Sequence, residues 1–419
     1  MSKIKVGVIG TGTIGHRVIA YGARQKDMEI CGVSKTTLDD VYDTTAMLWK
    51  SGIPVYASSR IGKDGLSKSL EEFRNYFNRI KDTKKIYGDV NELVPGTIED
   101  LVNESDVIVD TSAGTINKIS VSEYNKKEFY LSHNEKSGKK IKVIFQGGEE
   151  SDIGKISFNA AVNYDEAIEV GKSDEPYIRQ VSCNTTALSR ILYAFLENYT
   201  INRVYVVIVR RSTDPGEESK NILNDIYLGE HLPSHRGPDV EEVFKNYKNF
   251  KNLLDKQILT SAIKVTTDQM HAHDITLTFP VSAPYGEENC PTKEKFIEIC
   301  KNSILKNRIA LDDSVMHTSR LREFARRKER MLYMKAQIFP TCGDMFAVTA
   351  GLNSFAFIRR TTVYGDKWIH LKLQTAVHQE AIVIPDTIDA IRALCYDKLR
   401  VSRDDSIRMT DESLGMNEE

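Results

Sequence analysis

The segment VIGTGTIGHRV (residues 8–18) says most about the architecture of this chain. It places Gly10, Gly12 and Gly15 in a GxGxxG pattern, directly after an apolar, β-rich run and at the opening of a helical stripe. Glycines at this spacing permit a tight turn and let the backbone approach a pyrophosphate at the helix N-terminus. The segment therefore predicts a strand–turn–helix unit that binds a dinucleotide.

The chain around this segment alternates short apolar strands with helical stretches. Four such runs end abruptly in polar or glycine residues: KIKVGVIG, MEICGVSK, SDVIVDTS and KVIFQGGEE. This alternation is typical of a Rossmann-type, doubly wound parallel sheet, which we expect to occupy residues 1–182. The segments 62–91 and 118–141 are rich in lysine and glutamate and weakly patterned, so we interpret them as surface elaborations.

The second half of the chain has a different texture. Long, β-branched and partly alternating runs occur at residues 203–212, 262–279, 354–364 and 368–379. They predict an α+β catalytic domain with a mostly antiparallel sheet, covering residues 183–381. DTIDAIRALCYDKLR (386–400) reads as a final amphipathic helix with Pro385 at its start, and we expect the tail 382–419 to pack back on the first domain.

Composition excludes several classes of protein. The 419 residues are 41% hydrophobic and 28% charged, with a net charge of −2, which gives no sign of a nucleic-acid or membrane partner. The N-terminus has no signal-peptide pattern. The six cysteines form no CxxC pair, so we expect free thiols and a cytoplasmic location rather than disulfides or a zinc site.

The end of the second strand bears on the choice of cofactor. An NAD-binding fold usually carries an acidic residue there, whereas this chain has Ser34-Lys35-Thr36-Thr37. A cation among hydroxyl groups suits a 2′-phosphate, so NADP is predicted as the preferred cofactor, with NAD as a possible one. Two alternatives stay open: Asp39 or Asp40 folds back towards the ribose, or Lys35 is a solvated loop residue.

Cys183 is the cysteine with the most suggestive surroundings. It lies in VSCNTTALSRILYAFLENY (181–199), where apolar residues at helical spacing predict a helix that begins near Asn184 or Thr185. A helix start favours a thiolate over a thiol, which makes Cys183 a candidate nucleophile. The alternative is a small apolar residue that happens to precede a helix.

His271 and His273 are candidates for the base that such a nucleophile needs. They lie two residues apart in DQMHAHDITL and therefore on the same face of a strand. The pair also resembles half of a metal site, but no further ligand completes it at convincing spacing, so no metal is expected. Two histidines at a strand edge without a catalytic role remain the alternative.

Two basic clusters suggest a phosphorylated substrate. Arg210 and Arg211 end a strand, and HLPSHRGPDV (231–240) groups His231, His235 and Arg236 in a turn-rich loop. Guanidinium groups at such positions suit phosphate. Each cluster taken singly is also compatible with solvated surface arginines.

Together these motifs resemble one known family. VSCNTTALSR, IVRRSTDP, PSHRGPDV, ILTSAIKVTTDQMHAH and AVHQEAIVIPDTIDAIRA, with VIFQGGEE and VIVDTS, are similar to segments of the archaeal-type (class II) glyceraldehyde-3-phosphate dehydrogenases, in the same order. The resemblance covers most of the chain and is weak in residues 62–91, 118–141 and 280–370.

The resemblance implies a phosphorylating NAD(P)-dependent aldehyde dehydrogenase of glycolysis and gluconeogenesis, assembled as a homotetramer. Cys183 is then the nucleophile, His271 the catalytic base, and inorganic phosphate a co-substrate. The implied substrate-binding residues are Ser182, Cys183, Asn184, Thr185, Arg210, His235, Arg236 and Gly237. The implied cofactor-binding residues are Gly10, Gly12, Thr13, Ile14, Gly15, Lys35, Thr36, Asn117, Arg211 and Gln379.

Two other functions stay open at this point. One is another cysteine-dependent semialdehyde or acyl-phosphate dehydrogenase of the same architecture, against which the arginine clusters argue. The other is a non-catalytic NADP-binding protein, against which the presence of both Cys183 and His271 argues.

Overall fold

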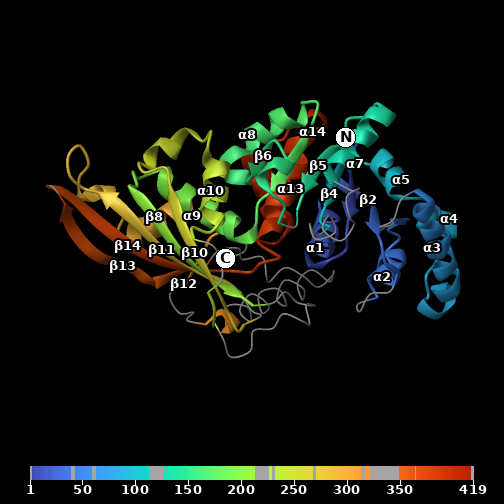
Figure 1. The fold of residues 1–419 in the computed structure, drawn as a ribbon, viewed down its shortest axis with the longest axis horizontal. Helices are drawn as coiled ribbons and strands as arrows, with labels where there is room; N and C mark the ends of the chain where they lie inside the picture. The colour runs from blue at the N-terminus through green and yellow to red at the C-terminus, as the bar shows by residue number, and fades with distance from the viewer. Residues whose placement is uncertain are drawn as a thin grey trace. The chain divides into compact units, whose positions relative to one another are not determined.

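The structure is a computed structural model in which the chain divides into two compact units. The first unit comprises residues 1–157, 165–180 and 387–402, and the second comprises 158–164, 181–386 and 403–419. The domain boundaries expected from the sequence stay predictions. The described residues, drawn in colour in Figure 1, are 2–38, 43–58, 63–112, 126–146, 148–212, 226–228, 232–267, 270–312, 317–320, 349–363 and 365–416.

The first unit is built on a seven-stranded sheet of order β3-β2-β1-β4-β5-β7-β6. Its strands are β1 (Ile4–Ile9), β2 (Met28–Lys35), β3 (Val55–Ala57), β4 (Val107–Asp110), β5 (Lys142–Phe145), β6 (Ile156–Phe158) and β7 (Tyr177–Gln180). The pairs that link β3, β2, β1, β4, β5 and β7 are parallel. β1 and β4 are almost wholly buried, as expected for central strands of a sheet covered on both faces. The Rossmann-type sheet predicted from the sequence is confirmed.

Helices connect these strands. The connecting helices are α1 (Thr13–Gly22), α2 (Thr44–Lys50), α3 (Lys63–Lys84), α4 (Val90–Leu93), α5 (Ile98–Glu104), α7 (Lys126–Ser137) and α8 (Ala160–Gly171). α5 starts with a capping box in which Thr97 and Asp100 satisfy each other's backbone N–H groups.

The polar segment 62–91 is more ordered than its composition suggested. It forms α3, whose Phe73 and Phe77 are four residues apart, on one face of the helix, and buried. The Phe77 ring packs edge-on against Trp49, with ring centroids 5.2 Å apart. The interpretation of this segment as a weakly patterned surface elaboration did not anticipate this helix, whose two buried phenylalanines pack it against the first unit.

The described part of segment 118–141 shows the same effect. α7 buries Tyr130, whose hydroxyl donates to the Asp110 carboxylate at the end of β4 (2.9 Å). Lys126, also buried, pairs with Glu149. This helix therefore contributes a side of the core of the first unit rather than a peripheral addition.

The second unit contains a mixed seven-stranded sheet of order β12-β13-β14-β11-β8-β10-β9. Its strands are β8 (Arg203–Arg211), β9 (Ile226–Tyr227), β10 (Ile258–Val265), β11 (His271–Pro280), β12 (Ala310–Asp312), β13 (Thr349–Val363) and β14 (Asp366–Val377). Four of its strand pairs are antiparallel, while β8–β10 and β12–β13 are parallel. The prediction of a mostly antiparallel sheet is confirmed, but the run 262–279 forms parts of two strands rather than one.

Helices cover one face of this sheet. They include α9 (Cys183–Leu196), which is buried along its whole length, and α10 (Arg236–Phe244). α10 contacts α9 and β10, and α9 contacts β14. α11 (Lys293–Asn302) stacks Phe296 on Phe195 of α9, with centroids 4.9 Å apart.

The C-terminal region forms three helices where the sequence suggested one. They are α13 (Val383–Leu394), α14 (Tyr396–Leu399) and α15 (Arg403–Ser413). Cys395 leaves the helical conformation between α13 and α14, and Arg400 ends α14 with a positive φ of 52°. The amphipathic pattern of residues 386–400 predicted helix correctly, but it did not predict where the helix is interrupted.

Buried ion pairs tie α9 to this region within the second unit. Arg190 of α9 pairs with Asp386 of α13, and their side chains are 0% and 1% exposed. The other Asp386 oxygen accepts from Asn159 Nδ2 (3.0 Å) and the Ala160 N–H (2.9 Å). Arg308 pairs with Asp411 of α15 (2.8 Å). Each buried charge thus has an opposite partner, without which its burial is strongly unfavourable.

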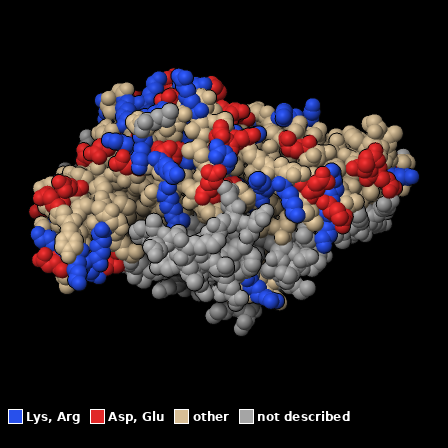
Figure 2. All heavy atoms as spheres, turned by 180° about the vertical axis from the view of Figure 1, so that it is seen from behind, with Lys and Arg blue, Asp and Glu red and all other residues tan. Residues whose placement is uncertain are grey.

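The surface carries charges of both signs. On the face drawn in Figure 2, acidic and basic side chains of the described residues are interspersed, in keeping with the net charge of −2. No helix in the described part of the chain is long and apolar enough to span a membrane.

Candidate active site

Cys183 is the first residue of α9, one position earlier than the sequence indicated. Ser182 is the N-cap, and its hydroxyl accepts from the Thr185 backbone N–H (3.3 Å) and lies 3.0 Å from the Thr185 hydroxyl. The cap leaves the Asn184 N–H directed at the Cys183 sulfur, where it lowers the pKa of the thiol. The sequence therefore builds a helix start around the sulfur.

The Cys183 sulfur is nevertheless a thiol in this structure. Burial raises its pKa to about 11 and outweighs the opposing effects of Arg210, the Asn184 N–H and Arg236, while Glu380 raises it further. The expectation that the helix start alone favours a thiolate neglected this desolvation. Reaction at neutral pH therefore requires that the thiol proton be transferred as the sulfur attacks.

His271, the first residue of β11, is almost completely buried. Its Nδ1 accepts a hydrogen bond from the Arg211 backbone N–H (3.1 Å), so the neutral ring carries its hydrogen on Nε2. Nε2 has no hydrogen-bond partner within the described residues. Burial, together with Arg210, His273, Arg211 and Arg236, holds the pKa of His271 well below its usual value, so the ring is neutral.

Cys183 and His271 share electrostatic neighbours. Arg210, at the end of β8, and Arg236, at the start of α10, lower the pKa of both groups. The structure therefore brings the proposed nucleophile, the proposed base and two of the predicted phosphate-binding cations into one region of the second unit.

The other predicted substrate residues have defined structural roles. His235 is the exposed N-cap residue of α10, and Arg236 is buried. The Gly237 N–H donates to Thr260 Oγ1 (3.0 Å), and a Cβ atom at Gly237 would lie 1.9 Å from the Ile258 carbonyl oxygen. Glycine is thus required there for the close packing of α10 on β10, and a substrate contact by this residue stays a prediction.

Glu380 is an acceptor near the site that the sequence reasoning missed, whereas Asn184 was predicted as a substrate-binding residue and its contact with His273 was not. Glu380 is buried and pairs with Arg211, and its second oxygen lies 3.4 Å from His378 Nδ1. Asn184 Oδ1 lies 2.8 Å from His273 Nε2. The Glu380–Arg211 and Asn184–His273 pairs join residues 169 and 89 positions apart in the chain, so no local sequence pattern could predict them. The predicted role of Gln379, which follows β14, in cofactor binding stays a prediction.

The glycine loop of the first unit fits a dinucleotide. Gly10 has a φ of +89°, and a Cβ atom at Gly15 would lie 2.2 Å from the Gly10 carbonyl oxygen. A Cβ atom at Gly12 would meet nothing within 4 Å, and Gly12 caps α1 without a side-chain hydrogen bond, next to Thr13 and Ile14. The start of α1 is therefore open to a pyrophosphate, which its N–H groups and dipole favour.

The end of β2 also has features that fit a ribose substituent. Lys35 is its last residue and is buried, and Thr36 follows it. The Ser34 hydroxyl is buried without a hydrogen-bond partner in the described part of the chain, although the Ser34 carbonyl accepts from the Gly10 N–H (3.1 Å). Asn117, His231, Asp39 and Asp40 lie outside the described residues.

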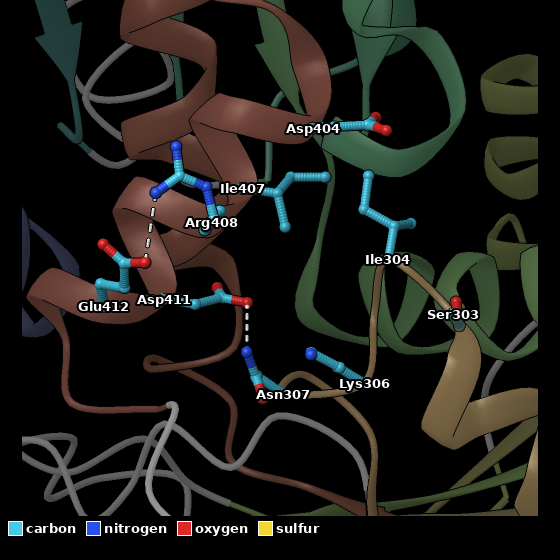
Figure 3. Close-up of a pocket in the computed structure, with 9 residues that line it drawn as sticks. All are labelled: Ser303, Ile304, Lys306, Asn307, Asp404, Ile407, Arg408, Asp411 and Glu412. Carbon is cyan, nitrogen blue, oxygen red and sulfur yellow. Dashed lines mark hydrogen bonds and ion pairs between the residues drawn. The ribbon is translucent and has the colours of Figure 1, made fainter.

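A pocket of about 410 Å³ lies elsewhere in the second unit (Figure 3). One wall is α15, and the other is the loop 303–307. Arg408 pairs with Glu412 (3.2 Å), and Asn307 contacts Asp411 (3.4 Å). The lining does not include Cys183 or His271, so we do not assign this pocket to the catalytic site. Within the described residues, no group of three or more His, Cys, Asp or Glu side chains is arranged to hold a metal ion.

Comparison with known proteins identifies the family. Residues 182–296 match the family model of the glyceraldehyde 3-phosphate dehydrogenase C-terminal domain. The glyceraldehyde-3-phosphate dehydrogenase of Archaeoglobus fulgidus is 35% identical over 417 residues, which cover 99% of both chains. The enzymes of Thermococcus kodakarensis (34% over 416 residues, 99% of each chain) and Picrophilus torridus (31% over 416 residues, 98% of this chain and 96% of the relative) are also similar. The chain therefore belongs to the archaeal-type glyceraldehyde-3-phosphate dehydrogenase family, as its motifs predicted.

Proposed function

We propose that this chain oxidises D-glyceraldehyde 3-phosphate, with NAD(P)⁺ and inorganic phosphate, to 1,3-bisphosphoglycerate. The observation that carries the proposal is the setting of Cys183, at a helix start and under the influence of the same two arginines as His271. A nucleophilic thiol beside two arginines suits an aldehyde that bears a phosphate, which a simple semialdehyde lacks.

The first step is addition of the Cys183 thiol to the aldehyde. A bond forms between the sulfur and the carbonyl carbon, and the thiol proton ends on the carbonyl oxygen, giving a thiohemiacetal. We assign the His271 Nε2–H, which has no partner within the described residues, as a donor to this oxygen as its charge develops. The backbone N–H groups at the start of α9 and the Asn184 side chain supply further donors.

The second step removes the hydroxyl proton as the carbon is oxidised to a thioester. For His271 to take this proton on Nε2, its ring hydrogen must move to Nδ1, which breaks the hydrogen bond from the Arg211 N–H. His271 therefore acts as a donor in the first step and as a base only after this shift. The low pKa of the ring favours rapid release of the proton afterwards.

The last step is attack of inorganic phosphate on the thioester, which releases the acyl phosphate and regenerates the Cys183 thiol. Arg210 and Arg236 are the residues that we assign to the phosphate groups, because both are guanidinium groups near the sulfur. His235, at the exposed start of α10, is the remaining side chain of this predicted set.

The dinucleotide, when bound, accepts the hydride that leaves the substrate carbon. We assign its pyrophosphate to Gly10, Gly12, Thr13, Ile14 and Gly15, and we assign Arg211, Gln379 and Asn117 to the rest of the cofactor. We further propose that NADP is preferred over NAD. Lys35 and the orphaned Ser34 hydroxyl at the end of β2 support this, because a 2′-phosphate gains charge-assisted hydrogen bonds there.

We propose a cytoplasmic homotetramer as the working form. The five described cysteines are free, which suits a reducing compartment. Tyr205 and Val207 of β8 are 39% and 41% exposed, which supports association through the sheet face that they occupy. Light scattering of the purified protein tests the tetramer.

The assay that tests the activity uses purified protein, glyceraldehyde 3-phosphate and each dinucleotide, with and without phosphate or arsenate. Reduction of the dinucleotide that depends on phosphate or arsenate is expected. A non-phosphorylated aldehyde of the same length is the matched control and should react poorly. Equal use of both aldehydes would favour a semialdehyde dehydrogenase, and no reaction with either would contradict the proposal.

A further inference from the structure

His273 is buried next to the catalytic residues and has no role in the mechanism above. It follows His271 by two positions on β11, so both rings project from the same face of the sheet. His273 is 1% exposed, and its Nε2 lies 2.8 Å from Asn184 Oδ1 on α9. This contact joins the strand that carries His271 to the helix that carries Cys183, across 89 residues of sequence.

The chemistry of the two side chains fixes the direction of this hydrogen bond. The Oδ1 atom of an asparagine only accepts, so His273 Nε2 carries the hydrogen and donates it. Burial lowers the pKa of His273 to about 3, so the ring is neutral at pH 7. A neutral ring with its hydrogen on Nε2 keeps an unprotonated Nδ1, and this single tautomer persists.

An asparagine amide presents either its oxygen or its nitrogen to a given point, depending on a rotation of the amide by 180°. When Oδ1 accepts from His273, the Nδ2 hydrogens must point to the other side of Cγ. Asn184 adjoins Cys183 and is 3% exposed, so water cannot readily supply an alternative donor to Oδ1. A flipped amide would instead present its oxygen, which repels a developing oxyanion.

We propose that His273 is a positioning residue that holds the Asn184 amide in the orientation in which Nδ2 donates to the oxygen of the thiohemiacetal. This inference rests on the proposed function, because the oxygen concerned is that of the aldehyde. It assigns the second histidine of the HAH segment to the orientation of a donor, leaving proton transfer to His271.

The polar atoms around His273 argue against a purely structural role. His273 Nδ1 has no hydrogen-bond partner within the described residues, and the same holds for the buried hydroxyl of Thr375, its register partner on β14. An unpaired buried polar group costs about 1–3 kcal/mol, so an apolar side chain would serve packing better at this position. The hydrogen bond from His273 Nε2 to Asn184 explains why a histidine occupies this position although its Nδ1 is unpaired within the described residues.

Two substitutions separate the role of Nε2 from that of the ring. His273→Gln places an amide N–H near the position of Nε2, whereas His273→Asn is too short to reach Asn184. We expect His273→Asn to lower kcat for glyceraldehyde 3-phosphate by about 10–100-fold, less than the loss of a whole oxyanion donor, with little change in KM. His273→Gln should stay within about threefold of the wild type. If His273→Gln were as impaired as His273→Asn, the proposal would be wrong.

A double-mutant cycle with Asn184→Ala distinguishes positioning from general damage. Once Asn184 is removed, His273→Asn should cause almost no further loss of kcat, whereas multiplied losses would overturn the proposal. Alkylation of Cys183 by iodoacetamide forms no oxyanion, so its rate should be unchanged in His273→Asn. A wild type that fails to oxidise glyceraldehyde 3-phosphate would contradict the proposed function instead, so the two failures are told apart.

Discussion

The reactivity of Cys183 provides the sharpest test of the site. Only the thiolate attacks an alkylating agent, so the rate of alkylation follows the thiolate fraction. Burial raises the pKa of Cys183 from 9.0 to about 11, which lowers the thiolate fraction at pH 7 by about 100-fold. The thiolate of a weaker acid is more nucleophilic, with a Brønsted slope of about 0.4–0.5, and this recovers about six- to tenfold. We therefore expect alkylation at pH 7 to be about tenfold slower than for an exposed thiol.

The pH profile is more diagnostic than the rate at one pH. With iodoacetamide and mass spectrometry of the Cys183 peptide, the rate should rise about tenfold per pH unit from pH 6 to 9.5 without a plateau. Circular dichroism at each pH verifies that the protein stays folded. A plateau below about pH 8 would show that the thiolate is stabilised in the free protein and would refute the reasoning.

Two variants with opposite expected effects serve as matched controls. Arg210 lowers the pKa of Cys183 more than any other group, so Arg210→Met should slow alkylation. Glu380 raises that pKa, so Glu380→Gln should accelerate alkylation, while its amide oxygen still accepts from Arg211. Changes in the same direction in both variants would indicate altered access to the sulfur rather than electrostatics.

Three further predictions concern the reaction and its cofactor. Cys183→Ser should lose nearly all turnover while still binding the dinucleotide, measured by nicotinamide fluorescence, and near-normal turnover would exclude Cys183 as the nucleophile. His271→Asn should lower kcat by about 10²–10⁴-fold, the loss expected for a positioned acid–base group. Steady-state kinetics measure this loss, and activity that a chelator abolishes would contradict the role of His271 as a base. NADP should be favoured over NAD by about 10–100-fold in kcat/KM, or roughly 1.4–2.7 kcal/mol. Lys35→Ala should remove most of that preference, and unchanged selectivity would show that the 2′-phosphate is recognised elsewhere.

Local pattern was sufficient for elements that local forces determine. The glycine spacing, the β-rich runs of the first unit and the polar start of α9 predicted their elements within a residue or two, but β13 begins at Thr349, five residues before the predicted run 354–364. The run 262–279 was wrongly predicted as one strand because β-branched residues lie on both sides of the break between β10 and β11. Composition alone did not show that these two strands pair with opposite sides of β8. α3 was missed because Phe73 and Phe77 contribute little to the average polarity of the helix but most of its burial.

The candidate catalytic residues could be predicted from the sequence, but their environment could not. Cys183 and His271 were predicted from a helix start and a family resemblance, and the structure places both under the influence of Arg210. The protonation of the thiol depends on how deeply the sulfur is buried, which no local pattern encodes. The bond between His273 and Asn184 joins a strand and a helix that only the tertiary fold brings together.

The pairing of Arg190 with Asp386 also sets an order of events during synthesis. The arginine belongs to α9, the helix that begins at Cys183, and its carboxylate partner lies 196 residues later in the chain. At about 5–20 residues per second, a ribosome needs about 10–40 s to supply that partner. Until then the guanidinium must stay in water, because burying it alone is costly. The helix that begins at Cys183 therefore stays incompletely packed until translation has passed Asp386.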